Sequence, residues 1–474
     1  MVGLTFAGGA SARPAAQRPN IIFVLTDDLD WNLVQYMPHV VRLRSQGTTF
    51  TNYLVTDSLC CPSRASTFTG SYPHNTGIFK NGDVDGGFKL FHARGEENDT
   101  FATRLHDRGY LTALMGKYLN GYTAQGRVDG KARYIPPGWS EWDVAGNGYA
   151  QFDYNLNENR RIVHYGSRPR AYLTDVLARK AGAFVDRASA KGKPFFLEVA
   201  TFAPHLPYTP APRDATDFPG LQAPRTSAFD EADVSDKPSW LRDHPSLTQA
   251  QIGSIDAAYR ARAQAVEAVD DLIAKLQARL RRHGVADNTY IFFSSDNGLH
   301  LGEHRLTPGK LTAFETDVRV PLVVAGPNVV AGRNVARVTE NVDLYPTFVR
   351  LGRAGTSPLV DGKSLVPLLR GSPAPDWRDA ALVEHHGPDF GVDAGPDAAP
   401  SGSGNPLTYE ALRLPHSIYV EYLNGEREYY DLESDPYELT NTYRKLSPSQ
   451  ADALHSQLAR LENCRGAASC RGGW

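Results

Sequence analysis

The sequence predicts an α/β fold with a mostly parallel central sheet that helices cover on both faces. Runs of apolar and β-branched residues recur, as expected of buried strands, at residues 21–25, 195–199, 290–293 and 320–324. A helical pattern rich in Ala, Leu, Arg and Gln covers residues 252–283 and stops before Gly284. Strands that alternate with helices are typical of parallel sheets buried on both faces.

The C-terminal part of the chain has a different pattern. Residues 386–406 are rich in Gly, Pro, Ser and Asp, which predicts a long loop, and long loops in compact domains are often functional. Two β-rich runs at 417–422 and 427–432 flank an Asn-Gly pair, which predicts a hairpin. A final helix is expected over residues 448–463.

Length and charge limit the possible architectures and partners. Because 474 residues exceed what one hydrophobic core usually supports, we expect a large domain over 19–370 and a smaller one over 371–474. Residues 1–18 are expected to be a disordered or processed terminus. The formal net charge of −3 argues against nucleic acid as the main partner. No apolar run approaches the ~20 residues that cross a bilayer, so no membrane span is expected.

Two of the four cysteines lie near the end of the chain. Cys464 and Cys470 enclose five residues, a spacing that suits a small disulfide loop, with two free thiols as the alternative. A zinc site would need two further ligands nearby, and the neighbours are mainly Arg, Gly and Ser. A disulfide favours an oxidising compartment, so we expect a secreted or extracytoplasmic protein.

The most informative segment is Cys60-Cys61-Pro62-Ser63-Arg64. Adjacent Cα atoms lie about 3.8 Å apart, which is too close for a relaxed disulfide. Proline stiffens the segment, and Arg64 places a permanent positive charge beside the first sulfur. The alternative is a buried cysteine pair at the start of a helix.

Oxygen-bearing side chains follow two of the expected strands. Asp27 and Asp28 come after the strand at 21–25, and Asp296 and Asn297 follow the strand at 290–293. In open α/β sheets ligands bind beyond the carboxyl ends of strands. An oxygen-rich set suits Ca²⁺ or Mg²⁺ rather than Zn²⁺. Taken singly, Asp-Asp is also a capping sequence and Asp-Asn-Gly a turn sequence.

The segment from Cys60 to Gly70 resembles the signature of the formylglycine-dependent (type I) sulfatase family, Cys-x-Pro-Ser-Arg followed by Thr-Gly. The resemblance extends through residues 19–22 and 296–298 to the tail segment 430–439. It implies an alkaline-phosphatase-like α/β/α sandwich with a smaller C-terminal α+β domain that contains a small antiparallel sheet. It also implies that a formylglycine-generating enzyme oxidises Cys60 to formylglycine during maturation.

The match is nearest to the glucosamine-6-sulfatase branch, which acts on glycosaminoglycans. The Cys60-Cys61 doublet, the segment 116–120 and the loop between Cys464 and Cys470 carry this resemblance.

By this resemblance, the site residues take definite roles. Calcium, with magnesium as the alternative, would be held by the strand-end residues and the modified cysteine: Asp27, Asp28, Asp296, Asn297 and Cys60. Lys117 and Lys310 would bind the sulfate group, and His205 would protonate the leaving alcohol. Arg64 belongs to the signature around the nucleophile. Lysines and a divalent cation would stabilise the charge on the sulfate oxygens as the ester bond breaks.

Three further positions could affect the site. Many sulfatases carry a histidine two residues after the lysine matched by Lys117, and this chain has Leu119 there. His300 and His304 have the spacing of a metal-binding helix pair, but Gly302 between them favours a loop. The pair His385-His386 precedes the long loop and could touch substrate.

We therefore expect an exported, Ca²⁺-dependent sulfuric ester hydrolase whose substrate is a small-molecule or carbohydrate sulfate ester. One alternative is a phosphonate or phosphate ester hydrolase on the same fold, because related enzymes use the same aldehyde. The other is a non-catalytic, Ca²⁺-stabilised carbohydrate-binding protein in which Cys60 stays unmodified.

Overall fold

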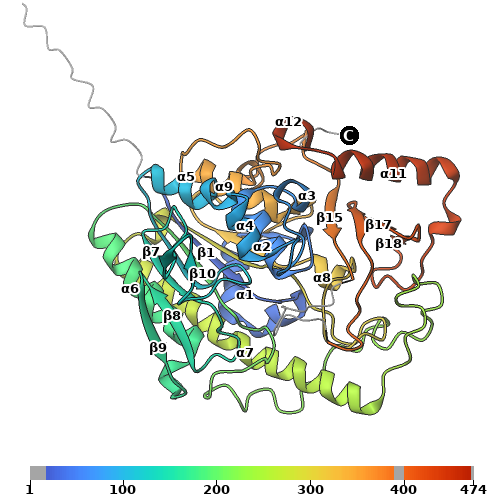
Figure 1. The fold of residues 1–474 in the computed structure, drawn as a ribbon, viewed down its shortest axis with the longest axis horizontal. Coiled ribbons are helices and arrows are strands. Elements are labelled where there is room, and N and C mark those ends of the chain that lie inside the picture. Colours follow the sequence, from blue (N-terminus) through green and yellow to red (C-terminus); the bar gives the residue numbers. More distant parts are fainter. Residues whose placement is uncertain (1–17, 389–399, 471–474) are drawn as a thin grey trace, which may run out of the picture.

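The computed structural model describes residues 18–388 and 400–470 (Figure 1). All but one residue of the expected N-terminal segment 1–18, and residues 389–399 of the predicted loop, lie outside this part of the chain. Within the described residues, no helix combines the length and apolar character needed to cross a membrane.

A ten-stranded mixed sheet runs through the molecule in the order β13-β2-β12-β11-β1-β10-β4-β7-β8-β9. Its central strands are all parallel: β11 (Thr289–Ser295), β1 (Asn20–Thr26), β10 (Phe195–Ala200), β4 (Leu111–Lys117) and β7 (Glu141–Ala145). Antiparallel pairs occur towards both edges, in β12 (Leu322–Ala325), β2 (Thr48–Phe50), β8 (Tyr154–Glu158) and β9 (Arg161–Tyr165). Strand β13 (Arg333–Val335) closes one edge. The predicted, mostly parallel α/β sheet is confirmed.

The boundaries of two predicted elements differ for local reasons. Strand β12 begins at Leu322, because Pro321 before it has no backbone N–H to donate to the sheet. Helix α7 (Gln249–Arg282) begins three residues earlier than expected. Its start is fixed by Thr248, whose side chain accepts from the backbone N–H of Gln251 in a capping box.

Helices cover both faces of the sheet, and alternate residues of β1 enter two separate cores. Ile22 and Val24 pack in the core that includes α1 (Pro38–Gln46), α6 (Leu173–Ala190) and α7. Ile21 and Phe23 pack on the opposite side. That side carries α2 (Cys60–Thr69), α4 (Gly87–Ala93), α5 (Phe101–Asp107) and α9 (Leu344–Leu351). The result is the expected α/β/α sandwich.

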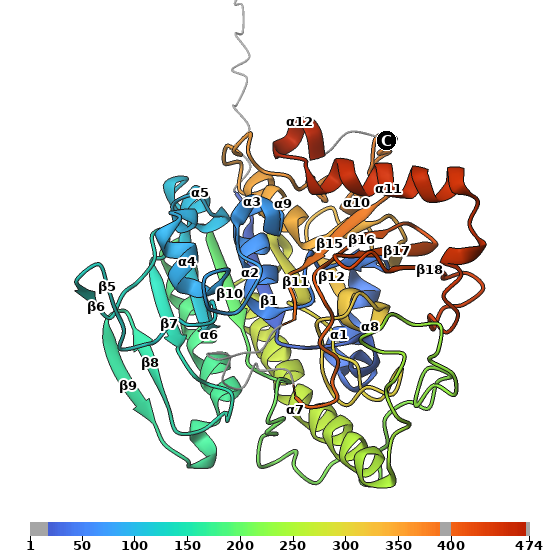
Figure 2. The ribbon, with the colours of Figure 1, turned by 45° about the vertical axis from the view of Figure 1, so that its right-hand side comes forward.

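The C-terminal part forms a four-stranded antiparallel sheet beside the main body (Figure 2). Its strands are β15 (Ala381–His385), β16 (Tyr409–Arg413), β17 (Ser417–Tyr422) and β18 (Arg427–Asp431). Helix α11 (Pro448–Glu462) packs against β15 and β16. The small antiparallel sheet, the hairpin and the final helix are confirmed. The domain boundary between residues 370 and 371 stays a prediction.

The remaining strands and α-helices are short. They are β3 (Tyr53–Leu54), β5 (Arg127–Val128), β6 (Lys131–Ala132), β14 (Thr339–Glu340), α3 (Pro73–Thr76), α8 (Glu315–Val318), α10 (Val366–Leu369) and α12 (Gly466–Cys470). Cys464 and Cys470 form the predicted disulfide, which ties α12 to the end of α11. Cys60 and Cys61 are buried and not disulfide-bonded.

Candidate active site

The parallel arrangement of the central strands brings the predicted site residues to one edge of the sheet. Asp27 and Asp28 follow β1, and Asp296 and Asn297 follow its neighbour β11. Lys117 is the last residue of β4. Gly116 before it has φ of 108°, and a Cβ there would lie 1.9 Å from the carbonyl oxygen of Ala200 in β10. Glycine therefore allows the close approach of these strands beside the site.

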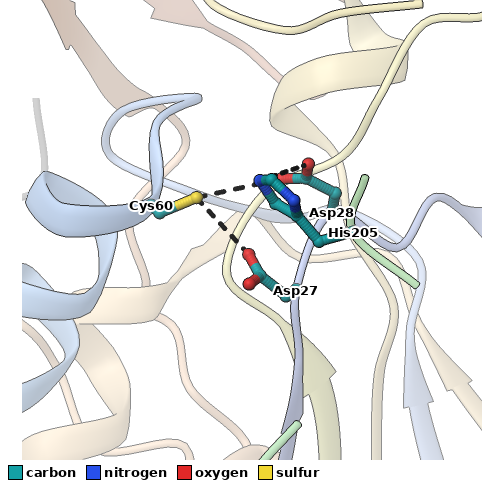
Figure 3. A group of neighbouring side chains, drawn as sticks. All are labelled: Asp27, Asp28, Cys60 and His205. Carbon is teal, nitrogen blue, oxygen red and sulfur yellow. Dashed lines mark hydrogen bonds and ion pairs between the residues drawn. The ribbon is translucent and has the colours of Figure 1, made fainter. Parts of the chain in front are cut away.

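Cys60 is the first residue of α2, a helix in which all ten residues are buried. Its Sγ lies 3.4 Å from Asp27 Oδ1 and 3.9 Å from Asp28 Oδ1. Figure 3 shows the sulfur pointing from the helix end towards both carboxylates, with His205 beside Asp28. Ligand atoms of these four residues all lie within 4.8 Å of one another.

Two buried lysines contact the cluster that Asp27, Asp28 and Cys60 form. Lys310 Nζ lies 2.8 Å from Cys60 Sγ and 2.7 Å from Asp28 Oδ1. Lys117 Nζ donates to Asp27 Oδ2 at 2.7 Å. Lys310 is therefore fixed at the sulfur of Cys60, and Lys117 is fixed at Asp27, whose other carboxylate oxygen lies 3.4 Å from that sulfur. Both could neutralise an anionic group bound there.

Arg64 fixes a third carboxylate from within α2. Its Nε donates to Asp296 Oδ2 at 2.8 Å, and its Nη2 lies 3.8 Å from Asp27 Oδ1. Asp296 Oδ1 in turn accepts the backbone N–H of Asp28 at 3.1 Å. Arg64 thus joins α2 to both strand ends.

His205 completes the cluster from the segment after β10. Its Nδ1 lies 2.8 Å from the carbonyl oxygen of Leu206, a contact in which Nδ1 donates. Its Nε2 lies 3.4 Å from Asp28 Oδ2. The ring packs against Tyr149, with 4.7 Å between ring centroids. These contacts direct Nε2 towards the cluster, where it could exchange a proton with a bound group.

Burial and the lysines set the ionisation of the site. Burial raises the pKa of Asp27 to about 6, although Lys117 acts in the opposite direction. Burial also acts to raise the pKa of Asp28, but Lys310 and His205 outweigh it and hold that pKa well below its usual range. Burial raises the pKa of the Cys60 thiol well above its ordinary value, despite the two lysines. An unmodified Cys60 is therefore a protonated, poorly nucleophilic thiol.

The donor set fits a hard divalent cation. The side chains of Asp27, Asp28 and Asp296 are almost fully buried and close together, and each lies beside one of the cationic side chains described above. Asn297 Nδ2 donates to Asp28 Oδ1 at 2.6 Å, whereas the buried Asn297 Oδ1 has no hydrogen-bond partner. Carboxylate oxygens and a free amide oxygen are the ligands that Ca²⁺ and Mg²⁺ prefer.

A pocket of about 820 Å³ opens beside the cluster. Lys117 and Tyr149 line it on the side of the cluster. Leu119, where the resemblance to sulfatases leads one to expect a histidine, also lines it and is 3% exposed. The remaining wall includes residues 80–89, Asn120 and Asn147. The volume falls within the usual range for small-molecule sites.

Other histidines singled out in the sequence lie away from the cluster. His300 Nδ1 is 3.0 Å from Asp317, and its Nε2 is 2.8 Å from the carbonyl oxygen of Ser403, which anchors part of the predicted 386–406 loop. His304 Nδ1 lies 2.6 Å from Glu231. The two therefore take separate carboxylate partners, in a loop as expected.

His385 and His386 lie in two different environments. His385 is fully buried in β15 against Tyr409, and it does not line the pocket. The expectation that His385 could touch substrate is therefore not supported. His386 stacks on Phe79, with 3.6 Å between ring centroids, next to the residues that form the pocket wall.

Two residues of the site were missed from the sequence. Tyr149 packs against His205, and Lys117 Nζ lies 5.0 Å from the centroid of its ring. Asn81 Oδ1 accepts the backbone N–H of Cys61 at 2.8 Å, so it holds the start of α2. Neither stands in a recognisable motif, and both reach the site from segments with no strong periodicity.

Comparisons with known proteins find similar sequences over most of the chain. The family model described as Sulfatase matches residues 19–354. The N-acetylglucosamine-6-sulfatase of Homo sapiens is 34% identical over 482 residues, which cover 96% of this chain and 86% of that protein. The enzyme of the same name from Capra hircus is 33% identical over 491 residues, covering 98% and 87%. An extracellular sulfatase SULF-1 homolog of Drosophila melanogaster is 35% identical over 383 residues, covering 78% and 33%.

Solved structures share the fold. BT4656, in complex with its substrate D-glucosamine-2-N,6-O-disulfate, superposes with a TM-score of 0.76 at 24% identity, covering 94% of this chain and 97% of that one. The phosphonate monoester hydrolase of Agrobacterium radiobacter gives a TM-score of 0.68 at 21% identity, covering 94% and 95%. The family match and the relatives above 30% identity identify the chain as a member of the sulfatase family of sulfuric ester hydrolases.

Proposed function

We propose that this sulfatase removes sulfate from a sulfated amino sugar, and that it uses a formylglycine derived from Cys60 and a bound Ca²⁺. The observation that carries the proposal is the arrangement around one sulfur atom. Asp27, Asp28, His205 and Lys310 surround Cys60 Sγ at the carboxyl ends of the parallel strands. Lys117 joins this group through Asp27, and Asp296 joins it through Arg64 and the backbone of Asp28. The high pKa of the thiol further supports modification, because an unmodified Cys60 would be a weak nucleophile.

The proposed catalytic groups each have a definite task. Formylglycine, once formed and hydrated, supplies a hydroxyl nucleophile where the thiol now lies. Lys117 and Lys310 lie beside that position and bind the sulfate oxygens as charge builds up on them. His205, with Nδ1 fixed by the carbonyl of Leu206, keeps Nε2 available to protonate the leaving alcohol. Arg64 positions Asp296 and the helix that carries Cys60.

The proposed metal ligands are the four strand-end residues and the modified cysteine: Asp27, Asp28, Asp296, Asn297 and Cys60. Bound Ca²⁺ would supply positive charge that polarises the sulfate ester. Mg²⁺ is the alternative, and it suits the same oxygen donors. The orphaned Asn297 Oδ1 is the specific feature that supports a cation here.

The substrate and the location are proposed from the relatives and the fold. The relatives named N-acetylglucosamine-6-sulfatase support a 6-O-sulfated glucosamine as the substrate. The pocket beside Lys117 has room for such a sugar. The disulfide and the extracellular sulfatase relative support a secreted or extracytoplasmic protein that a formylglycine-generating enzyme modifies before export.

Turnover measurements test the proposal. Protein produced with a formylglycine-generating enzyme should hydrolyse glucosamine 6-sulfate in preference to an aryl phosphonate, and Cys60→Ala should abolish the activity. Cys61→Ala is the matched control and should retain much of the activity, because Cys61 fills the variable position of the signature. Preference for the phosphonate would favour the other activity known on this fold. No turnover of either class would favour a carbohydrate-binding protein.

A further inference from the structure

Residues 80–87 form one wall of the pocket and are fixed directly to the nucleophile helix. We call them the pocket loop. Backbone hydrogen bonds close the loop, from Phe79 N to Asp85 O at 2.7 Å and from Gly87 N to Lys80 O at 3.0 Å. Asn81 within it accepts the N–H of Cys61 at 2.8 Å. These bonds hold the backbone of the pocket loop at a defined place relative to the start of α2, including the residue whose side chain precedes Asn81.

That side chain is Lys80, whose environment differs from that of the two lysines of the cluster. Lys117 and Lys310 each form an ion pair with an aspartate. Lys80 is half-buried and lines the pocket. In the part of the chain that the structure describes, no carboxylate lies within ion-pair distance of its ammonium group. A half-buried lysine that lines a pocket without a carboxylate partner is suited to bind an anionic ligand.

The acidic residues of the pocket loop do not remove this preference. Asp85 Oδ2 lies 3.8 Å from Nδ1 of His386, whose ring is stacked on Phe79. Asp83 is exposed at the tip of the loop. Lys89 also lines the pocket but is exposed, so water solvates its charge. Lys80 is thus the half-buried cation of the outer pocket, distinct from the pair that faces Cys60.

We propose that Lys80 binds a second anionic group of the substrate, a sulfate or a carboxylate, while the scissile sulfate ester lies at Cys60. This inference rests on the proposed sulfatase activity and adds a substrate class to it: sugars that carry one more negative charge than the ester. The pocket volume of about 820 Å³ allows a sugar to extend from Lys117 to the pocket loop. Lys80 is then a specificity residue, outside the bond-breaking machinery.

The test compares substrates that differ in the second charge. Lys80→Gln removes the charge and keeps most of the side-chain length. For 2-N,6-O-disulfated glucosamine, kcat/KM should fall about 10- to 100-fold through KM, the usual effect of losing a hydrogen bond to a charged group. For N-acetylglucosamine 6-sulfate and 4-nitrophenyl sulfate the variant should match the parent. Lys80→Arg should restore most of the loss, and Lys131→Gln, an exposed lysine in β6, is the matched control.

A second pair of substrates separates the two sources of the anionic group. A disaccharide with a uronate and an N-acetylated, 6-O-sulfated glucosamine tests the carboxylate, and the monosaccharide disulfate tests the N-sulfate. Loss on either one supports the inference and identifies the group. Equal effects on substrates with and without the second negative charge, or no effect on any substrate, would overturn it.

A binding measurement tests the subsite independently of the catalytic activity. Calorimetric titration of 2-N,6-O-disulfated glucosamine into Cys60→Ala and into Cys60→Ala with Lys80→Gln requires no turnover. Weaker binding of the double variant supports the subsite even if the proposed reaction fails. Unchanged binding refutes the subsite even if the parent protein is an active sulfatase.

Discussion

At the scale of single residues, the predicted groups reach the cluster from several separate segments, and their neighbours fix their orientation. The lysines are held by Asp27 and Asp28, and His205 is held by a backbone carbonyl. These side chains are almost completely buried, so they lose little conformational entropy when substrate binds. Catalysis by such a site should depend sharply on the chemistry of individual side chains.

The role proposed for His205 predicts a dependence on the leaving group. His205→Ala should lower kcat on a sugar sulfate by about 10²- to 10⁴-fold, the usual contribution of general acid catalysis. The same variant should lose far less on 4-nitrophenyl sulfate, because nitrophenolate departs without a proton. Steady-state kinetics on both substrates measure the contrast, with the exposed His164→Ala as control. Equal losses on the two substrates would show that His205 acts in some other way.

At the scale of elements, the central strands both form the core of the sheet and carry ionisable residues next to the site. Strand β10 pairs in parallel with β1 and β4, and its Glu198 lies in register with Phe23 and Leu114. Glu198 is 1% exposed, and its Oε2 has no hydrogen-bond partner. Burial raises its pKa to about 8, although Arg64 acts in the opposite direction. A carboxylic acid that stays protonated in the folded protein makes stability depend on pH.

The sign of this pH dependence follows from the protonation of Glu198 in the folded and unfolded states. Between about pH 4.5 and 8 the unfolded chain releases the Glu198 proton while the folded chain keeps it, so this group lowers the free energy of unfolding as pH rises. The loss is roughly 1 kcal/mol per pH unit. Glu198→Gln should therefore melt near the parent at pH 5 and increasingly above it at pH 6.5 and 8. Thermal melts at these three pH values, with exposed Glu433→Gln as control, measure the difference. A constant difference would contradict the raised pKa.

At the scale of the whole molecule, the site joins parts of the chain that are far apart in sequence. Asp27 and Asn297 follow neighbouring strands, and Cys60 belongs to a helix on one face of the sheet. A cation held by all three would stabilise the folded protein, because it binds the folded state and has no site in the unfolded chain. Metal binding is therefore expected to change global stability as well as activity.

Removal of the metal tests this expectation. EGTA treatment should lower both Tm and activity, and Ca²⁺ should restore both whereas Zn²⁺ should not. At a hundredfold excess of Ca²⁺ over Kd, the stabilisation would be about 2.7 kcal/mol. Asp296→Asn should reduce the response of Tm to Ca²⁺, and exposed Asp452→Asn on α11 should leave it intact. A metal-stripped protein with unchanged Tm and rate would show that these residues hold no functional ion.

The sequence predicts local elements and strand-end residues better than it predicts long-range pairing. The runs at β1, β10 and β11 are uniformly apolar, so both their burial and the convergence of Asp27 and Asp296 follow from the rule for parallel sheets. The antiparallel placement of β12 and the position of the pocket loop depend on contacts between distant segments. Asn81 and Tyr149 were missed for this reason, because their partners are decided by tertiary packing.

The central claim is that the modified Cys60 is the nucleophile of this sulfatase, and peptide mass spectrometry of the active, purified protein tests it most directly. The account predicts that the peptide containing both cysteines has the mass expected when the CH₂–SH group of Cys60 becomes CHO, with Cys61 still a thiol. Fragment ions between the two residues assign the change to one of them. A fully active protein in which Cys60 retains its thiol, or in which Cys61 alone is modified, would contradict the account.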